Sequence, residues 1–321
     1  MRVRHRARFL LLASALLGCA RAPALTVRAS PPAAAAQDKG NPIEVPETIP
    51  LVVEVGGRRF PVPLVHATVN GVETLLIVDT GSSHNVVTSS FAAAHAIAVG
   101  TTATTGTGHA NETIDARPIA SLSLSVGAVS RTLTDAVVVA APPVFEQLGI
   151  GGFLSPQTFF LATTVLDFPR HEIVILQGDR SAVTAWLDRT HAGQPRQAVA
   201  PRPGTEARKI FLEASLDTKP PVLAELDTGG SKTEFLESYA GESNGPTGSG
   251  GISVSGVNVV TKTVLDRTVV VGGLRFGPMA VESREKMEGY QGLLGMTVLA
   301  HVAVVIPHDR TQDLILVRAP E

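Results

Sequence analysis

The chain of 321 residues has a single cysteine, Cys19, and few aromatic residues, which make up 4% of the sequence. One cysteine excludes an internal disulfide framework and any metal site built from several cysteines. The chain also lacks a basic excess, because 27 lysines and arginines face 29 acidic residues, for a formal net charge of −2. Without positive charge to neutralise phosphates, we expect no nucleic-acid partner. No pair of histidines has the HExxH spacing, and we expect no metal site.

The N-terminus has the charge and length profile of an export signal. Arginines dominate the first eight residues, residues 9–17 carry no charge, and no acidic residue occurs before Asp38. Nine uncharged residues are too few to span a bilayer as a helix. We therefore predict that residues 1–18 are a signal peptide that the mature protein lacks.

The sequence Leu16-Leu17-Gly18-Cys19 resembles the lipobox of bacterial lipoproteins. That resemblance implies that Cys19 is lipidated and becomes the new N-terminus, anchoring the chain to a membrane. Ala20 after the cysteine favours the outer membrane, facing the periplasm. Residues 19–47 are rich in alanine and proline and lack apolar periodicity, so they are predicted to be a tether. The alternative is an ordinary signal peptide that is cut elsewhere, with Cys19 discarded.

From Pro50 onward, short runs of aliphatic and β-branched residues alternate with Gly, Pro, Asn and Asp, as in residues 75–78 and 268–271. This texture predicts a mostly β protein with frequent hairpins. Helices are expected only at residues 89–96 and at residues 181–190, around the single tryptophan.

One motif occurs twice, as Asp79-Thr80-Gly81 and as Asp227-Thr228-Gly229. Each copy follows an apolar run, a turn and a second apolar run. Two chance copies in a chain of this size have a probability below about 1%. A glycine-ended apolar motif follows each copy, ending at Gly152, 73 residues after Asp79, and at Gly295, 68 residues after Asp227.

Each half then closes with a pair of apolar runs, at residues 165–175 and 304–316. Four features thus recur in the same order, which indicates a duplicated domain. We predict an N-terminal lobe at residues 48–180, a polar, proline-rich linker at 181–206 and a C-terminal lobe at 207–321. Each lobe is large enough to hold its own core.

The doubled Asp-Thr-Gly resembles the active-site motif of aspartic peptidases, more narrowly of bacterial retropepsin-like proteases with two lobes in one polypeptide, as in the pepsins. The resemblance covers nearly all of residues 50–321. It implies two homologous β-barrel lobes with the active site in the cleft between them. It also implies an aspartic endopeptidase acting on peptide or protein substrates, with no cofactor.

In such a site Asp79 and Asp227 share one proton, because two like charges so close together cannot both ionise easily. One aspartate activates a water molecule and the other polarises the peptide carbonyl. The resemblance further implies that the hydroxyls of Thr80 and Thr228 hydrogen-bond across the lobes. Tight turns at Gly81 and Gly229 would support the two aspartates.

Two further sets of residues are expected to support this site. Gly152 and Gly295 would let a short strand approach closely beneath each aspartate loop. A flap over the substrate should come from a glycine-containing hairpin in each lobe. The candidates are Gly106 and Gly108 in the first lobe and Gly250 and Gly251 in the second.

The two copies of the motif differ at the next position, which is Ser82 in the first and Gly230 in the second. A Ser82 hydroxyl could bond to Asp79 and stabilise its ionised form. We therefore predict that Asp227 is the more readily protonated aspartate, and that activity extends to less acidic pH.

Two alternatives remain open. One is a catalytically silent bilobal protein whose cleft binds peptides or an envelope partner, although a binding groove gains nothing from two mutually repelling carboxylates. The other is pairing of each lobe with its twin on a second chain. Pairing within one chain through the linker is entropically easier, so we expect a monomer.

Overall fold

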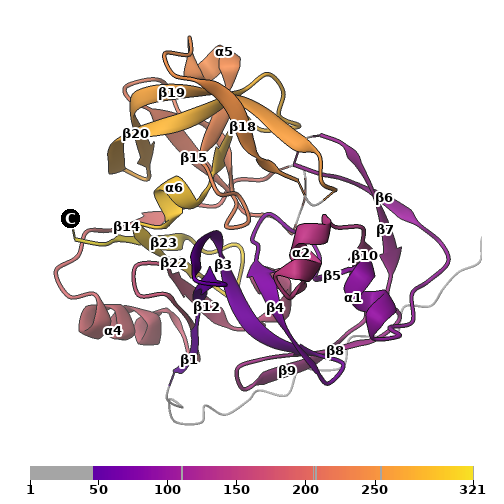
Figure 1. Cartoon of the computed structure of the whole chain (residues 1–321). Helices are drawn as coiled ribbons and strands as arrows, with labels where there is room; N and C mark the ends of the chain where they lie inside the picture. The colour runs from indigo at the N-terminus through magenta and orange to yellow at the C-terminus, as the bar shows by residue number, and fades with distance from the viewer. Residues whose placement is uncertain (1–45, 110, 205, 207, 254, 321) are drawn as a thin grey trace, which may run out of the picture. The chain divides into compact units, whose positions relative to one another are not determined.

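The computed structural model describes residues 46–320 apart from residues 110, 205, 207 and 254. The predicted signal peptide, Cys19 and nearly all of the predicted tether lie outside the described residues. Within them strands predominate, and they form three sheets of ten, seven and six strands (Figure 1). The prediction of a mostly β fold is confirmed.

The first half forms the ten-stranded sheet, in the order β6-β7-β10-β5-β11-β4-β3-β8-β9, with β2 paired to β3. The strands are β2 (Val52–Val55), β3 (Arg58–Val69), β4 (Val72–Val78), β5 (Val86–Thr88), β6 (Thr104–Thr107), β7 (Thr113–Pro118), β8 (Leu122–Val126), β9 (Val129–Leu133), β10 (Val137–Val139) and β11 (Ile150–Leu154). Because β11 lies between β4 and β5, the chain from residue 79 to 85 forms a loop across its end.

The second half repeats this arrangement in the seven-stranded sheet, in the order β15-β16-β21-β17-β20-β19-β18. The strands are β15 (Phe211–Leu216), β16 (Val222–Leu226), β17 (Glu234–Leu236), β18 (Thr247–Ile252), β19 (Asn258–Val271), β20 (Leu274–Arg284) and β21 (Gly292–Leu294). Strand by strand, this is the order β3-β4-β11-β5-β10-β7-β6 of the first half. The shared topology confirms the duplication read from the sequence.

The third sheet joins the halves, in the order β1-β13-β12-β22-β23-β14. Its strands are β1 (Glu47–Pro50), β12 (Thr163–Asp167), β13 (Glu172–Leu176), β14 (Arg196–Val199), β22 (Val302–Ile306) and β23 (Leu314–Arg318). The expected terminal hairpins, β12–β13 and β22–β23, are both present. They pair with each other where β12 meets β22, so one sheet contains strands from both halves.

The stretch expected to be a linker, residues 181–206, contains regular structure. It holds most of α4 (Arg180–Thr190), as the sequence predicted around the tryptophan, and all of β14. The Asp179 carboxylate caps α4 by accepting the Ser181 and Ala182 N–H groups. Trp186 and Leu187 pack the helix on the six-stranded sheet. The polar composition of the stretch obscured only the strand, β14.

The other helices are short: α1 (Ser89–Ala94), α2 (Pro143–Gln147), α3 (Pro156–Phe159), α5 (Glu237–Ala240) and α6 (Met296–Leu299). The helix expected at residues 89–96 is present as α1, and the Thr88 hydroxyl caps it by accepting the Phe91 N–H. In the described part of the chain, none of the helices combines the length and apolar character needed to cross a membrane.

Strand register corrects one equivalence between the halves. Gly152 in β11 and Gly292 in β21 each pair with the residue three positions before the aspartate of their half. Gly152 therefore corresponds to Gly292, while Gly295 corresponds to Ser155. The sequence comparison aligned the last glycine of each motif, because no pairing partner was available to set the register.

Candidate active site

Each aspartate stands where a buried strand ends. Asp79 follows β4 and its N–H donates to the Leu154 carbonyl over 2.8 Å. Asp227 follows β16 and its N–H donates to the Leu294 carbonyl over 3.1 Å. The short strands β11 and β21 thus extend their parallel pairing to the aspartates, which fixes the backbone of both residues in the same way.

The threonines of the two motifs bond to each other across the halves. The Thr80 N–H donates to Thr228 Oγ1 and the Thr228 N–H donates to Thr80 Oγ1, each over 3.0 Å. The Thr80 hydroxyl in turn donates to the Leu226 carbonyl over 2.7 Å, and the Thr228 hydroxyl to the Val78 carbonyl over 2.6 Å. Both threonines are completely buried. These are the cross-lobe hydrogen bonds that the family resemblance implied.

The glycines of the two motifs make room for the opposite carboxylate. A Cβ on Gly81 would lie 2.6 Å from Asp227 Oδ1, and a Cβ on Gly229 would lie 2.7 Å from Asp79 Cγ. Any side chain at either position would push the partner aspartate away. Glycine at the third position is therefore required by the approach of the two loops, in addition to the turn itself.

Gly152 and Gly295 lie against backbone, as expected. A Cβ on Gly152 would meet the Val86 carbonyl oxygen at 1.9 Å, and one on Gly295 would meet the Lys232 carbonyl oxygen at 2.0 Å. The first contact is with strand β5 and the second with the loop that follows Asp227, and only glycine permits either approach.

The carboxyl groups of Asp79 and Asp227 differ in their surroundings. Although Asp79 as a residue is only half-buried, its Oδ1 is buried and has no donor among the described residues. Burial, the charge of Asp227 and a hydrogen bond between the two carboxyl groups raise the pKa of Asp79 well above its usual value. Asp227 Oδ1 accepts the Gly229 N–H over 2.9 Å, a bond that favours a charged oxygen. The two carboxyl groups therefore differ in their hydrogen-bond partners.

The prediction that the Ser82 hydroxyl bonds to Asp79 is wrong. The Ser82 hydroxyl donates to the His84 carbonyl over 2.7 Å and is not bonded to Asp79. Its carbonyl is held by the hydroxyl of Ser155 and the amide of Gln157. These bonds fix Ser82 within its own half. Without that bond, the order in which the two aspartates take up the proton stays a prediction.

The first candidate flap is a hairpin of β6 and β7. Gly106 lies in β6, and Gly108 opens the turn, where its N–H donates to the Glu112 carbonyl over 2.8 Å. In the second half, Gly250 and Gly251 lie in β18 at an irregularity in its pairing with β19, and the chain reverses later, between Ser253 and Val257. The turn expected at Gly250 and Gly251 is therefore not there. These glycines lie instead at a strand irregularity, which is another place where glycine is favoured.

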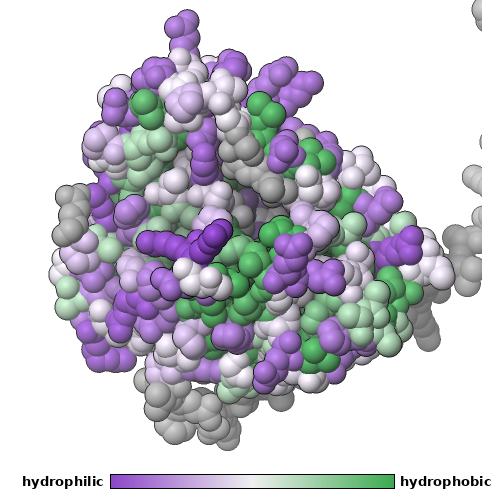
Figure 2. Space-filling model, in the orientation of Figure 1, coloured by the Kyte–Doolittle hydropathy of each residue, from purple (hydrophilic) through white to green (hydrophobic). Residues whose placement is uncertain are grey.

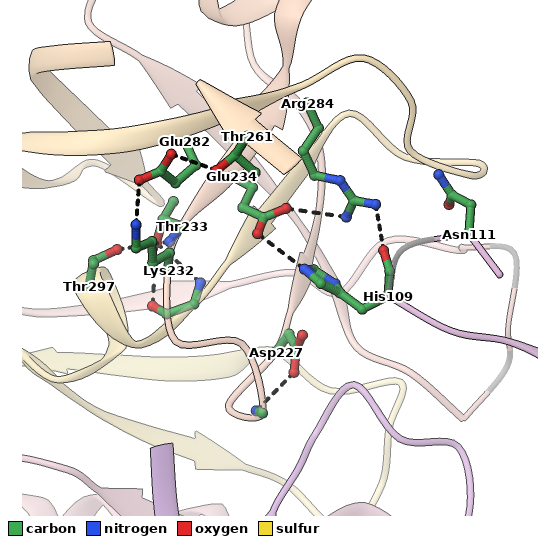
Figure 3. A network of polar contacts seen from close by, with 12 residues as sticks. His109, Asn111, Asp227, Lys232, Thr233, Glu234, Thr261, Glu282, Arg284 and Thr297 are labelled. Atoms are coloured by element: carbon green, nitrogen blue, oxygen red, sulfur yellow. Dashed lines mark hydrogen bonds and ion pairs between the residues drawn. The ribbon is translucent and has the colours of Figure 1, made fainter. Parts of the chain in front are cut away.

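The turn of the β6–β7 hairpin is fixed to the second half by a buried ionic cluster, drawn in Figure 3. His109 Nε2 lies 3.1 Å from Glu234 Oε1, and Arg284 Nη1 lies 3.2 Å from Glu234 Oε2. Arg284 Nη2 also donates to the His109 carbonyl. Glu234 and Arg284 are almost completely buried. Sequence reasoning missed this cluster, whose local sign was an acid at the start of an otherwise apolar strand.

Two more contacts hold the same turn. The Asn111 side-chain amide donates to the Lys286 carbonyl over 3.2 Å, and the Ser255 hydroxyl donates to Glu112. Burial by itself lowers the pKa of His109, but the hydrogen bond and charge of Glu234 and the charge of Asp227 outweigh burial and the opposing charge of Arg284, so that the pKa is raised above its usual value.

A groove of about 520 Å³ reaches the Asp227 loop at Ser231. Its lining is mainly apolar and includes Phe60 and Val62 of β3 and Met296 of α6. On the face drawn in Figure 2, hydrophobic residues gather over the region of β3 and α2. A lining of this kind accommodates apolar side chains.

Comparison with known proteins finds similarity to one family over part of the chain. Residues 65–154 match the family model of aspartyl proteases, a segment that includes Asp79 but not Asp227. The match supports an aspartic-protease-like fold and a protease function. Among solved structures, the chain is similar to the aspartic proteinase from Irpex lacteus, with 14% identity, a TM-score of 0.48 and coverage of 86% of this chain and 98% of that one. No curated protein matches the chain.

Replacing Thr80 with valine should lower the free energy of unfolding by about 3 kcal/mol, since the Thr228 N–H and the Leu226 carbonyl both lose a buried partner. Thr80→Ser keeps the hydroxyl and should cost only about 1 kcal/mol for the lost methyl group. Urea unfolding at one pH measures both. Equal stability of the two variants would show that the cross-lobe bonds contribute nothing.

Protonated His109 should hold the hairpin turn in place more firmly than neutral His109. Because its folded-state pKa is raised, this stabilisation is present below about pH 6.5 and is lost as the pH rises through the higher, folded value. After correction for intrinsic rates, hydrogen exchange at the Gly108 and Asn111 amides should be about fivefold more protected at low pH. His109→Gln should remove that dependence, whereas His66→Gln, on an exposed position of β3, should leave it intact.

Proposed function

We propose that this protein is an aspartic endopeptidase that hydrolyses peptide bonds through a water molecule activated by Asp79 and Asp227. The observation that carries the proposal is the contact between the two duplicated loops, in which each carboxyl group lies against the glycine of the other loop. Two acids that repel each other destabilise a fold unless they share a proton, and the charge of Asp227 is one of the causes that raise the pKa of Asp79. The aspartyl protease match at residues 65–154 supports the same reaction.

In this reaction Asp227 is the general base and Asp79 the general acid. The ionised Asp227 takes a proton from the water as the water oxygen bonds to the peptide carbon. The protonated Asp79 donates a hydrogen bond to the carbonyl oxygen and stabilises the charge that develops on it. Asp227 then gives its proton to the departing amine as the carbon–nitrogen bond breaks. The products are a carboxylic acid and an amine, and the dyad regains its single proton.

The β6–β7 hairpin fits the role of a flap in this proposal. Its turn crosses from the first half to Glu234 and Arg284, and the charge of Asp227 acts on His109 within that turn. A segment in this position excludes water from the reacting groups and must move for substrate to bind. Both aspartates come from one chain, and we expect the working unit to be a monomer.

We also propose that the protein is a bacterial lipoprotein, anchored through Cys19 to the outer membrane and facing the periplasm. The support is the arginine-rich start, the uncharged stretch and the lipobox-like sequence that ends at Cys19. The substrates of such an enzyme would be peptides or proteins of the cell envelope.

Asp79→Asn and Asp227→Asn should each lower kcat/KM for peptide cleavage at least about 10³-fold, because each removes one partner of the acid–base pair. Cleavage by the full chain is measured from about pH 3 to pH 8, with and without a statine-type transition-state inhibitor. Asp188→Asn, which alters an exposed acid paired with Arg196, should keep full activity. Activity that survives in both loop variants would overturn the proposal, and a folded wild type without cleavage would favour the silent peptide-binding alternative.

Cys19→Ala should abolish incorporation of labelled fatty acid and release the protein from the membrane fraction, since the chain has no other cysteine. Asp79→Asn provides the matched control, because it should remain labelled and membrane-bound. Retention of the Cys19→Ala protein in the membrane would contradict lipid anchoring at this residue.

A further inference from the structure

A buried acid, Glu225, lies on β16 two residues before Asp227. Its counterpart in the first half is Ile77, two residues before Asp79 on β4, since the two residues occupy the same register position against β21 and β11. Ile77 packs in an apolar cluster with Leu64, Ile150 and others. The fold is therefore satisfied by an apolar residue at this position, and the acid in the second half needs another explanation.

Glu225 is 2% exposed and has specific polar partners. Lys209 Nζ lies 3.2 Å from its Oε1 and also 3.1 Å from Glu206 Oε1. The Tyr290 side chain forms a hydrogen bond to Glu225 as well. Lys209 precedes β15 and Tyr290 precedes β21, so separate segments converge on this one carboxyl group. A buried acid is retained at such a position only with partners of this kind.

Glu225 and Asp227 lie on the same side of the chain. Side chains alternate in direction along extended backbone, so residues two apart point the same way and lie about 7 Å apart. The charge of Glu225 raises the pKa of Asp79, and the charge of Asp227 raises the pKa of Glu225. The three acids therefore act on one another as a set.

Lys209 faces Glu225 and Asp79, His109 of the hairpin turn faces Asp227, and Arg284 acts on Tyr290 beside Glu225. Burial raises the pKa of Glu225 most, Lys209 lowers it, and Asp227 raises it, which brings it to about 7. Lys209 itself is held by Glu225 and Glu206, which together raise its pKa above the usual value despite its burial. Lys209 thus stays charged while Glu225 titrates.

We propose that Glu225 is a positioning residue that sets the pH range of the Asp79–Asp227 pair. Its negative charge, near neutral pH, makes the shared proton harder to remove. The dyad consequently keeps its single proton to higher pH than it would with an isoleucine at this position. The inference rests on the proposed function for its effect on cleavage, but the proton coupling itself does not depend on catalysis.

The direct test is the pH profile of kcat/KM for Glu225→Gln, which removes the charge and keeps the shape. The alkaline limb should move to lower pH by about one to two units, the size expected for one charge about 7 Å away at an effective dielectric constant of about 20. Glu213→Gln is the matched control, because Glu213 is an exposed acid on β15 paired with Arg202 over 3.0 Å. Its profile should match the wild type.

The Glu225→Gln variant could fold poorly, because it leaves Lys209 with Glu206 as its one acidic partner among those two. A second variant keeps the test valid in that case. The double variant Glu225→Ile with Lys209→Met copies the apolar character of the first half, a replacement that buried ion pairs often tolerate. Its alkaline limb should also move down, by a smaller amount, because Glu225 acts on Asp79 more strongly than Lys209 does. An unmoved limb in these variants, with changed activity, would assign Glu225 a merely structural role and overturn the proposal.

Carbon-13 NMR titration of the carboxyl groups in the full chain separates this proposal from the proposed function. The Asp79 carboxyl should titrate at lower pH in Glu225→Gln than in the wild type, whether or not any peptide is cleaved. An identical Asp79 titration in the two proteins would overturn the proposal. Failure of the wild type to cleave peptides, with the Asp79 titration shifted as expected, would reject the peptidase and leave the coupling standing.

Discussion

The exchange of hydrogen bonds between Thr80 and Thr228 is the constraint on which the site depends. Each hydroxyl accepts the N–H of the other threonine and donates to a carbonyl of the opposite strand. All of these groups are buried, so none can bond to water if the halves separate. The exchange therefore fixes Asp79 and Asp227 against each other despite their like charge. Burial, together with the charge of Asp227 that this proximity brings, raises the pKa of Asp79.

The same topology supports very different electrostatics in the two halves. Three buried acids surround the Asp227 loop in the second half, Glu225, Glu234 and Glu282, and each has a cationic partner. By strand register, the equivalent positions in the first half hold apolar residues, which are Ile77, Val86 and Val137. The surroundings of the aspartate loop are thus apolar at these positions in the first half and charged in the second. We call the three acids and their cationic partners the charged flank.

The charged flank also connects the site to the hairpin above it. Glu234 is the first residue of β17, directly after the Asp227 loop, and its carboxylate contacts both His109 and Arg284 (Figure 3). One carboxylate thereby links the position of the β6–β7 turn to the second half. Because the charge of Asp227 also raises the pKa of His109, the charge of this aspartate and the contacts of the β6–β7 turn are coupled.

The sequence by itself determined the β fold, the duplication, the two aspartate loops and the hairpin that carries Gly108. Each of these is a local pattern, because alternation of apolar residues and the turn residues between them report the burial of their own strand. The register between strands is not a local pattern, because it depends on a partner strand elsewhere in the chain. The sequence comparison therefore aligned Gly295 with Gly152, although Gly295 corresponds to Ser155. The strand β14 within the predicted linker was missed for a related reason, since it pairs with β23, which lies far along the chain.

Only the tertiary structure decided the proton and charge relations of the site. Ser82 lies close to Asp79 in the sequence, but its hydroxyl bonds to His84, and it is burial and the charge of Asp227 that raise the pKa of Asp79. The partners of His109 and Asn111 lie up to 175 residues away along the chain. The effect of one charge on another depends on their distance in space, which the sequence does not record. The pattern of a strand is set by residues that follow one another along the chain, so the sequence does record it.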